Sequence, residues 1–156
     1  ERVVGNEPFA VLLADDFLTC SGSGVTFDLV NAFAASGTSQ LSVMEVQGAD
    51  IAKYGVVVPG VEAGSVVGLV EKPAPNEAPS NLASIGRYVL TPDIFDILRH
   101  QAAGAGGEIQ LADAIDTQAR NGKVSAVMLQ GLRFDCGSVK GYLSAIMHVA
   151  ATLDEE

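Results

Sequence analysis

Short strand-like apolar runs alternate with segments of helical periodicity along most of this chain, and that alternation constrains the fold most strongly. Residues 9–14 form a continuous apolar run, which is typical of a strand buried on both faces, as in a parallel sheet. Residues 26–36 then place apolar side chains at helical spacing, and Gly37 suits the left-handed end of a helix. We therefore predict a strand over 9–14, a helix over 26–36 and a second strand over 41–46.

The rest of the chain continues the same pattern. Two apolar segments with a glycine-rich turn between them, 54–58 and 66–71, predict a hairpin, and the proline-rich segment 72–79 predicts an extended loop. The remaining predicted elements are a strand over 84–90, a helix that starts at Thr91, a helix over 107–120, a strand over 124–130 and a core-facing helix over 139–153. Alternating strands and helices indicate an α/β fold with a doubly wound sheet, in which the hairpin is a local α+β departure.

Length and charge narrow the class of protein. The chain has 156 residues, as in one compact domain, and 9 Lys and Arg against 19 Asp and Glu, a net charge of −10. A nucleic-acid-binding protein needs clustered basic side chains, so neither nucleic acid nor a membrane surface is an expected partner. No apolar run approaches the ~18 residues that span a bilayer, and the first residues lack the pattern of a signal peptide. We therefore expect a cytoplasmic protein.

Acidic side chains follow two predicted strands, where open α/β sheets bind ligands. Asp15 and Asp16 close the first apolar run, and Asp135 precedes Gly137 and the last helix. Two carboxylates brought together suit Mg²⁺, which takes one or two carboxylates and completes its shell with water and substrate phosphates. Acids at strand ends are common, however, and the alternative that they only cap turns and helices stays open.

A second candidate is the pair Glu71 and Lys72. A carboxylate accepts hydrogen bonds from sugar hydroxyls, and an ammonium group meets a phosphate as a point charge. Adjacent strand residues face opposite ways, so both reach one ligand only where the chain turns, which Pro73 favours. The alternative, a solvated ion pair beside a proline-rich loop, stays open. In the segment 53–55, Gly55 would let the backbone approach a ligand closely.

A set of short motifs runs in order along essentially the whole chain. They are PFAVLLADD at 8–16, KYG at 53–55, VEKP at 70–73, APSNLA at 78–83, GRY at 86–88, GAGGEIQL at 104–111 and FDCG at 134–137. As a set, they closely resemble the bacterial UTP–glucose-1-phosphate uridylyltransferases, or UDP-glucose pyrophosphorylases. The resemblance implies a partial doubly wound, Rossmann-like nucleotidyltransferase (nucleotide-diphospho-sugar transferase) fold, with a mixed sheet and helices on both faces.

The resemblance also implies an activity and a set of site residues. In that family, a phosphate oxygen of glucose 1-phosphate attacks the α-phosphorus of UTP and gives UDP-glucose and pyrophosphate. Transferred by motif, Lys72 binds the sugar phosphate, Glu71 the glucose hydroxyls and Gly55 the sugar through its backbone. Mg²⁺ is the implied cofactor, held by Asp15 and Asp135. The predicted catalytic residues are Asp15, Lys72 and Asp135, and the predicted substrate-binding residues are Asp16, Tyr54, Gly55, Glu71 and Lys72.

One part of the family pattern has no counterpart in these residues. The nucleotide-binding G-x-G-T-R loop and a downstream P-K-x-M stretch are absent, so the resemblance implies a single truncated nucleotidyltransferase domain over 1–156, the sugar- and metal-binding half. We expect this chain alone to release no pyrophosphate from UTP and glucose 1-phosphate, because it lacks the phosphate cradle.

We also expect a homo-oligomer, since an interrupted sheet exposes strand edges and apolar surface. Two alternatives stay open. One is another sugar-1-phosphate nucleotidyltransferase, such as a thymidylyltransferase. The other is a non-catalytic sugar-phosphate-binding or interaction module.

Overall fold

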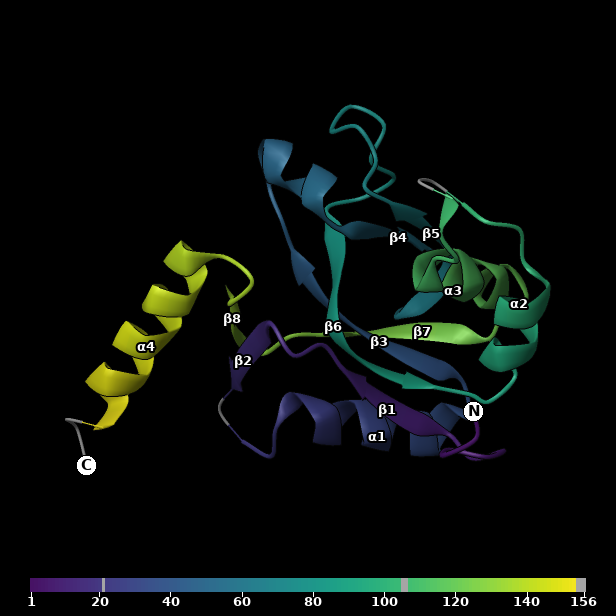
Figure 1. The fold of residues 1–156 in the computed structure, drawn as a ribbon, viewed down its shortest axis with the longest axis horizontal. Coiled ribbons are helices and arrows are strands. Elements are labelled where there is room, and N and C mark those ends of the chain that lie inside the picture. The colour runs from purple at the N-terminus through teal and green to yellow at the C-terminus, as the bar shows by residue number, and fades with distance from the viewer. Residues whose placement is uncertain (21, 105–106, 154–156) are drawn as a thin grey trace.

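Two sheets organise the computed structural model, which describes residues 1–20, 22–104 and 107–153 (Figure 1). The larger sheet has the strand order β1-β6-β3-β7-β5-β4, and the small sheet pairs β2 with β8. The strands are β1 (Phe9–Leu12), β2 (Asp16–Cys20), β3 (Ser39–Glu45), β4 (Gly55–Pro59), β5 (Ser65–Glu71), β6 (Leu82–Leu90), β7 (Val124–Met128) and β8 (Gly131–Asp135). The helices are α1 (Val25–Ser36), α2 (Ile94–His100), α3 (Leu111–Arg120) and α4 (Val139–Leu153), with a short 3-10 helix, η1, at Gly48–Lys53.

The larger sheet is mixed, as expected. Strands β3 and β7 run parallel, whereas the other described pairs in this sheet are antiparallel. The predicted hairpin is confirmed as β4 and β5, and its register places Gly55 directly opposite Glu71. The hairpin therefore brings two predicted site residues side by side.

Helices cover both faces of this sheet, which the alternation along β3 shows. The Gln40 side chain donates a hydrogen bond from Nε2 to Ser36 Oγ, at the end of α1, at 2.9 Å. The next side chain, Leu41, is fully buried in a cluster that includes Ala114 and Ile115 of α3. Because neighbouring strand residues point to opposite faces, α1 and α3 lie on opposite sides of the sheet. The predicted fold class is thus confirmed.

The main core lies between the larger sheet and α2 and α3. Its buried side chains are Leu41, Val43, Val57, Val66, Leu69, Leu90, Ile94, Ala114, Ile115, Ala119 and Val124. Besides this apolar packing, Asp116 Oδ1 on α3 accepts a hydrogen bond from the Leu69 N–H on β5 at 2.9 Å. Helix α3 therefore holds β5, the strand that ends at Glu71, by both apolar and polar contacts.

The first apolar run does not form a parallel, fully buried strand, so that prediction was wrong. Strand β1 ends at Leu12 and pairs antiparallel with β6 at the edge of the sheet. Its burial alternates, and Leu12 is 56% exposed. A continuous apolar run does not reveal which of its residues will lack a covering layer. Consequently Asp15 lies in the turn between β1 and β2 rather than at the end of a central strand.

The third helix starts later than predicted. We expected it from Gly107, but α3 begins at Leu111, with Gln110 in extended conformation before it. Gly107 has a φ of 76°, a left-handed conformation that does not propagate a right-handed helix. Residues 105 and 106 of the same motif lie outside the described residues.

Helix α4 forms where expected but does not face a core in this structure. Of its described residues only Ala145 is buried, while Val139 is 80% and Met147 73% exposed. Figure 1 shows α4 beyond the small sheet, on the side away from the larger sheet. The helical spacing of its apolar residues specified the helix, but not the surface that would cover it. In the described part of the chain, no helix is both long and apolar enough to cross a membrane.

Candidate active site

A cavity of about 370 Å³ is lined by residues of both sheets. It brings together the whole set of residues predicted from the sequence, namely Asp15, Asp16, Tyr54, Gly55, Glu71, Lys72 and Asp135. It also contains residues to which the sequence analysis gave no role, namely Leu13, Lys53, Ser84, Gly86, Tyr88 and Arg133. One wall therefore carries the acids around β2 and β8, and the other carries the end of the β4–β5 hairpin.

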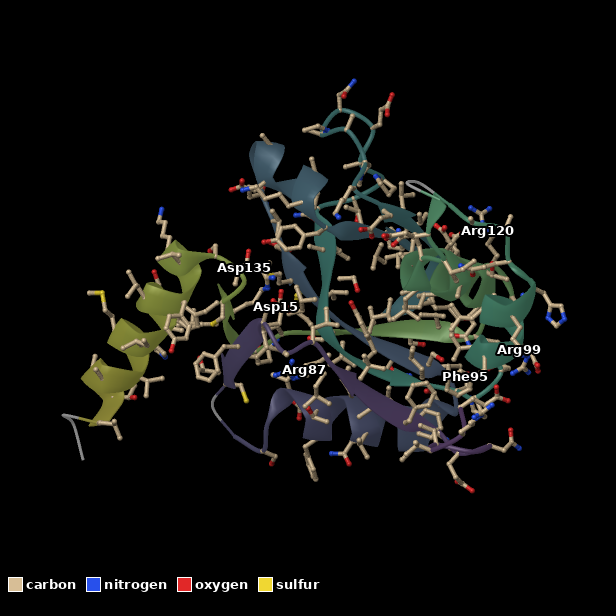
Figure 2. All side chains as sticks on the ribbon, in the orientation of Figure 1. Asp15, Arg87, Phe95, Arg99, Arg120 and Asp135 are labelled. Carbon is tan, nitrogen blue, oxygen red and sulfur yellow. The ribbon has the colours of Figure 1, made fainter. Side chains whose placement is uncertain are left out.

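Asp15 and Asp135 converge over Gly137. A Cβ atom placed on Gly137 would lie 3.0 Å from Asp15 Oδ2 and 3.2 Å from Asp135 Oδ1. Two backbone N–H groups hold this arrangement. The Cys136 N–H donates to the Asp15 carbonyl at 2.7 Å, and the Gly137 N–H donates to the side-chain oxygen Oδ1 of Asp135 at 3.2 Å. Figure 2 shows the two labelled aspartates close together between the small sheet and the larger one. The glycine leaves room for both carboxylates at one point.

Glu71 and Lys72 reach the same cavity because the chain turns at Lys72. Lys72 has a φ of 45°, and in the described chain no other residue except glycine has a positive φ. Its N–H donates to the Tyr54 carbonyl at 2.9 Å, and its Nζ lies 3.5 Å from Glu71 Oε1. The predicted turn is confirmed, and it costs backbone strain of about 1–3 kcal/mol. Such strain at a cavity wall is typical of a functional position.

Gly55 packs directly on the Glu71 carboxylate. A Cβ atom on Gly55 would lie 3.1 Å from Glu71 Oε2, which is closer than side chains normally pack. The absence of a side chain here leaves the backbone of β4 and the carboxylate of β5 facing the same space. This geometry suits a ligand with several hydroxyl groups, which bind carboxylates and backbone groups together.

Some charged side chains of the cavity have an oppositely charged partner in the protein, and others have none among the described residues. Lys53 is paired with Asp50 at 2.6 Å, Lys72 lies beside Glu71, and Arg133 is paired with Asp16. By contrast, no ion pair within the described residues involves Asp15 or Asp135. A phosphate brought near these two carboxylates would be repelled unless a cation lay between them.

The fit of a divalent cation rests on the same two carboxylates. Within the described residues, no cluster of three or more histidine, cysteine or acidic side chains is arranged to hold a metal. Two converging oxygen donors with open space beside them match Mg²⁺, which keeps several waters and shares phosphate oxygens with a substrate. The predicted Mg²⁺ ligands therefore fit that ion by donor chemistry, and metal binding stays a prediction.

Asp16 and Tyr54 are engaged inside the protein. Asp16 Oδ2 accepts from the Gly86 N–H at 2.7 Å, and its Oδ1 accepts from Arg133 Nε at 2.7 Å. The Tyr54 hydroxyl accepts from Arg133 Nη1 at 2.8 Å. Their predicted contact with substrate stays a prediction, and the structure shows an internal role for both. Arg133 could not be identified from the sequence because β8 was not predicted; within that strand, Arg133 and Asp135 lie two residues apart and share one face.

The floor of the cavity comes from β6. Ser84, Gly86 and Tyr88 share one face of that strand and all line the cavity. Burial raises the pKa of the Tyr88 phenol, so it stays protonated at neutral pH. The Ser84 hydroxyl is buried near that phenol, but no hydrogen bond of normal geometry joins it to a partner in the described region. A second cavity of about 210 Å³ continues past Ser84 and Tyr88 toward Gln110 and Ile115.

Comparison with known proteins adds independent evidence. The chain is 47% identical over 148 residues to a UTP–glucose-1-phosphate uridylyltransferase of Pseudomonas aeruginosa, with 92% of this chain and 53% of the relative covered. An apo UDP-glucose pyrophosphorylase superimposes with a TM-score of 0.91 and 41% identity, over 97% of this chain and 57% of the other. A UDP-glucose pyrophosphorylase complexed with UDP-glucose gives 0.90 and 40%, over 97% and 59%.

These matches extend along the chain but not along the relatives. The chain spans about half the length of the curated relatives it matches. The family description that fits is that of the nucleotidyl transferases, and the match runs over residues 1–152. Fold, sequence and the arrangement of the cavity agree, and the chain belongs to the nucleotidyl transferase family.

Proposed function

We propose that this chain forms the sugar-phosphate-binding and metal-binding half of the site of a UTP–glucose-1-phosphate uridylyltransferase. The observation that carries the proposal is the single cavity in which Glu71, Lys72 and Gly55 face Asp15 and Asp135. The relatives support the choice of substrates, because relatives of 47% and 44% identity are named UTP–glucose-1-phosphate uridylyltransferases.

The sugar binds beside Gly55 and Glu71. The Glu71 carboxylate accepts hydrogen bonds from glucose hydroxyls, and the bare backbone at Gly55 allows the pyranose ring to approach β4. The phenol of Tyr88 and the hydroxyl of Ser84 supply further polar groups at the floor of this pocket. A hexose of this polarity is recognised by such convergent donors and acceptors rather than by charge.

The phosphate of the sugar binds at Lys72. Its ammonium group is the cation that the turn at Lys72 directs to the cavity, and it is only loosely paired with Glu71, at 3.5 Å. In the proposed reaction, an oxygen of this phosphate forms a new bond to the α-phosphorus of UTP. The bond from that phosphorus to the β-phosphate oxygen breaks, and the electron pair leaves with pyrophosphate. Lys72 positions the attacking oxygen and offsets its charge.

Asp15 and Asp135 would hold Mg²⁺ at Gly137. When bound, such an ion neutralises charge on the phosphates and orients them for displacement. Neither carboxylate takes part in an ion pair within the described residues, which leaves both available to such an ion. They would otherwise repel the sugar phosphate, so the proposal requires that metal and sugar phosphate bind cooperatively.

Calorimetric titration of the 156-residue chain with glucose 1-phosphate, with and without Mg²⁺, tests this proposal. We expect Mg²⁺ to raise the affinity about tenfold, or ~1.4 kcal/mol. In Asp135→Asn we expect that enhancement to disappear, while the metal-free affinity stays equal or rises because one repelling carboxylate has been neutralised. Asp28→Asn, an exposed change on α1, is the matched control and should behave as the wild type.

Two outcomes would contradict the proposal. If the wild-type chain binds no glucose 1-phosphate at millimolar concentration, it does not contain the sugar-phosphate site. If Asp135→Asn keeps the full enhancement by Mg²⁺, Asp135 is not a ligand of the metal.

We also propose that the chain self-associates. The support is the row of apolar side chains that α4 exposes, namely Val139, Tyr142, Leu143, Ile146, Met147 and Leu153. Light scattering is expected to show dimers or larger species at high concentration, and a clean monomer would contradict the proposal. We propose the cytoplasm as the location, because the charged sugar phosphates and nucleotides of the proposed reaction do not cross a bilayer unaided.

A further inference from the structure

We infer that Arg133 is a positioning residue that holds the small sheet against the larger one. In this way it sets the distance between the metal-binding and sugar-binding walls of the cavity. The inference rests on the proposed function for what each wall binds. Asp16 and Tyr54 accept the hydrogen bonds of Arg133, and Gly86 binds the other oxygen of Asp16. Arg133 itself need not touch a substrate.

The contacts that hold the two sheets together are charged and polar, and they join four segments of the chain. From β8, Arg133 Nε donates to Asp16 Oδ1 at 2.7 Å, and Nη2 contacts the same oxygen. Its Nη1 donates to the Tyr54 hydroxyl at 2.8 Å, and the guanidinium carbon lies 5.1 Å from the centre of the Tyr54 ring. The chain of contacts continues from Asp16 Oδ2 to the Gly86 N–H on β6, at 2.7 Å.

These contacts matter because the two sheets form separate hydrogen-bonded units. Strands β2 and β8 pair only with each other among the described strands. Asp15 immediately precedes β2, and Asp135 is the last residue of β8 and lies opposite Asp16 in the register. The sugar-binding wall, by contrast, belongs to β4 and β5 of the larger sheet. Whatever holds Asp16 and Arg133 therefore also holds the two candidate metal ligands.

The Asp16 side chain is buried and that of Arg133 is largely covered, so water has little access to the pair. The side chain of Asp16 is 4% exposed and that of Arg133 is 13% exposed. A buried ion pair gains little net stability over apolar residues, but removal of one partner leaves an uncompensated charge. Space around the pair is also tight, since a Cβ atom on Gly86 would lie 2.6 Å from Asp16 Oδ2. Such a pair contributes more to a single relative placement than to net stability.

The hydrogen bonds of Asp16, Tyr54 and Arg133 join these residues to other protein groups. Both carboxylate oxygens of Asp16 accept hydrogen bonds within the protein, and the Tyr54 hydroxyl accepts one from Arg133. The donors of the guanidinium are directed to Asp16 of the small sheet and to Tyr54, the residue directly before β4 of the larger sheet.

Hydrogen exchange of the ligand-free chain gives the first test. In Arg133→Met we expect the Gly86 amide and the amides of β2 and β8 to exchange at least tenfold faster, with the amides of β3 and β7 unchanged. Arg99→Met is the matched control, because Arg99 is paired with Glu1 and Asp96 and lies far from Asp15 and Asp135 (Figure 2). Unchanged exchange at Gly86, or equal acceleration throughout the molecule, would overturn the inference.

The second test measures cooperativity between ligands, which loss of stability alone does not change. For the wild type, the proposed function predicts that Mg²⁺ raises the affinity for glucose 1-phosphate about tenfold. In Arg133→Met we expect this enhancement to fall to less than twofold, while each ligand still binds in the absence of the other. Arg133→Lys keeps the charge but not the forked geometry, so we expect it to restore only part of the enhancement. It also serves as the test variant if Arg133→Met does not fold.

The outcomes separate the two proposals. Full cooperativity in a folded Arg133→Met overturns the positioning role and leaves the proposed function intact. A wild-type chain that binds no glucose 1-phosphate refutes the proposed function, and the positioning role with it. In that case the exchange experiment still decides whether Arg133 joins the two sheets.

Discussion

Replacement of Lys72 by methionine is expected to lower the affinity of the chain for glucose 1-phosphate by about 10- to 100-fold. A charge-assisted hydrogen bond to phosphate contributes about 1.5–3 kcal/mol, and methionine keeps the length of the side chain while it removes the charge. Calorimetric titration at fixed Mg²⁺ concentration measures the change. A Lys72→Met affinity within twofold of the wild type would show that Lys72 does not bind the phosphate.

Lys53→Met is the control for Lys72. Lys53 lines the same cavity, but it is paired with Asp50 at 2.6 Å. If only the overall charge of the cavity determined binding, Lys53→Met and Lys72→Met would lose the same affinity for glucose 1-phosphate. We expect the affinity of Lys53→Met to fall less than threefold.

A second variant separates function from stability at the same position. Glycine adopts a positive φ without steric strain, so Lys72→Gly relieves the strain at this position. This gain offsets the larger conformational entropy of glycine in the unfolded state. We expect the free energy of unfolding to stay equal or rise by up to about 1 kcal/mol, while the affinity falls as in Lys72→Met. A variant that is as stable as the wild type but does not bind would identify Lys72 as a residue retained for its ammonium group.

Gln118→Leu is expected to lower the free energy of unfolding by about 2–4 kcal/mol. Gln118 is fully buried on α3, where its Oε1 accepts from Ser39 Oγ at 3.1 Å. Its Nε2 donates to Thr91 Oγ1 at 3.0 Å and to Asp93 Oδ1 at 2.8 Å. Leucine fills a similar volume but removes these three hydrogen bonds, so that the side chains of Ser39, Thr91 and Asp93 keep, within the described residues, only the bonds among themselves and with Lys123. Urea unfolding followed by circular dichroism measures the loss.

Gln130→Leu, at an exposed glutamine between β7 and β8, is the matched control and should change stability by less than about 0.5 kcal/mol. The folded fraction of Gln118→Leu should bind glucose 1-phosphate with wild-type affinity, because none of the partners of Gln118 lines the cavity. A stability loss below about 1 kcal/mol would mean that the network is replaced by other hydrogen bonds in the variant.

Parts of the site could be predicted from the sequence because they are local. Glu71, Lys72 and Pro73 are adjacent, and proline together with a strand end is enough to indicate a turn there. The β4–β5 hairpin is also local, because its strands are neighbours in the sequence, but the pairing of Gly55 with Glu71 also depends on a register shift between Val58 and Pro59.

The acidic wall is different. Asp15 and Asp135 stand near the two ends of the chain, and they meet because β2 pairs with β8. Both strands are short and mix polar with apolar residues, so neither stood out in the apolar pattern, and Arg133 was missed with them. A strand of this kind is specified by its partner more than by its own side chains.

The sequence by itself determined the alternation of strands and helices, the hairpin, the turn at Lys72 and the likeness to a family, because these depend on neighbouring residues and on motifs. Only the tertiary structure decided that β1 is an edge strand, that α4 leaves its apolar residues exposed and that Arg133 contacts both Asp16 and Tyr54. The physical reason is that burial and pairing belong to contacts between distant segments, and one apolar or charged residue has the same appearance in the sequence whether or not another segment comes to cover it.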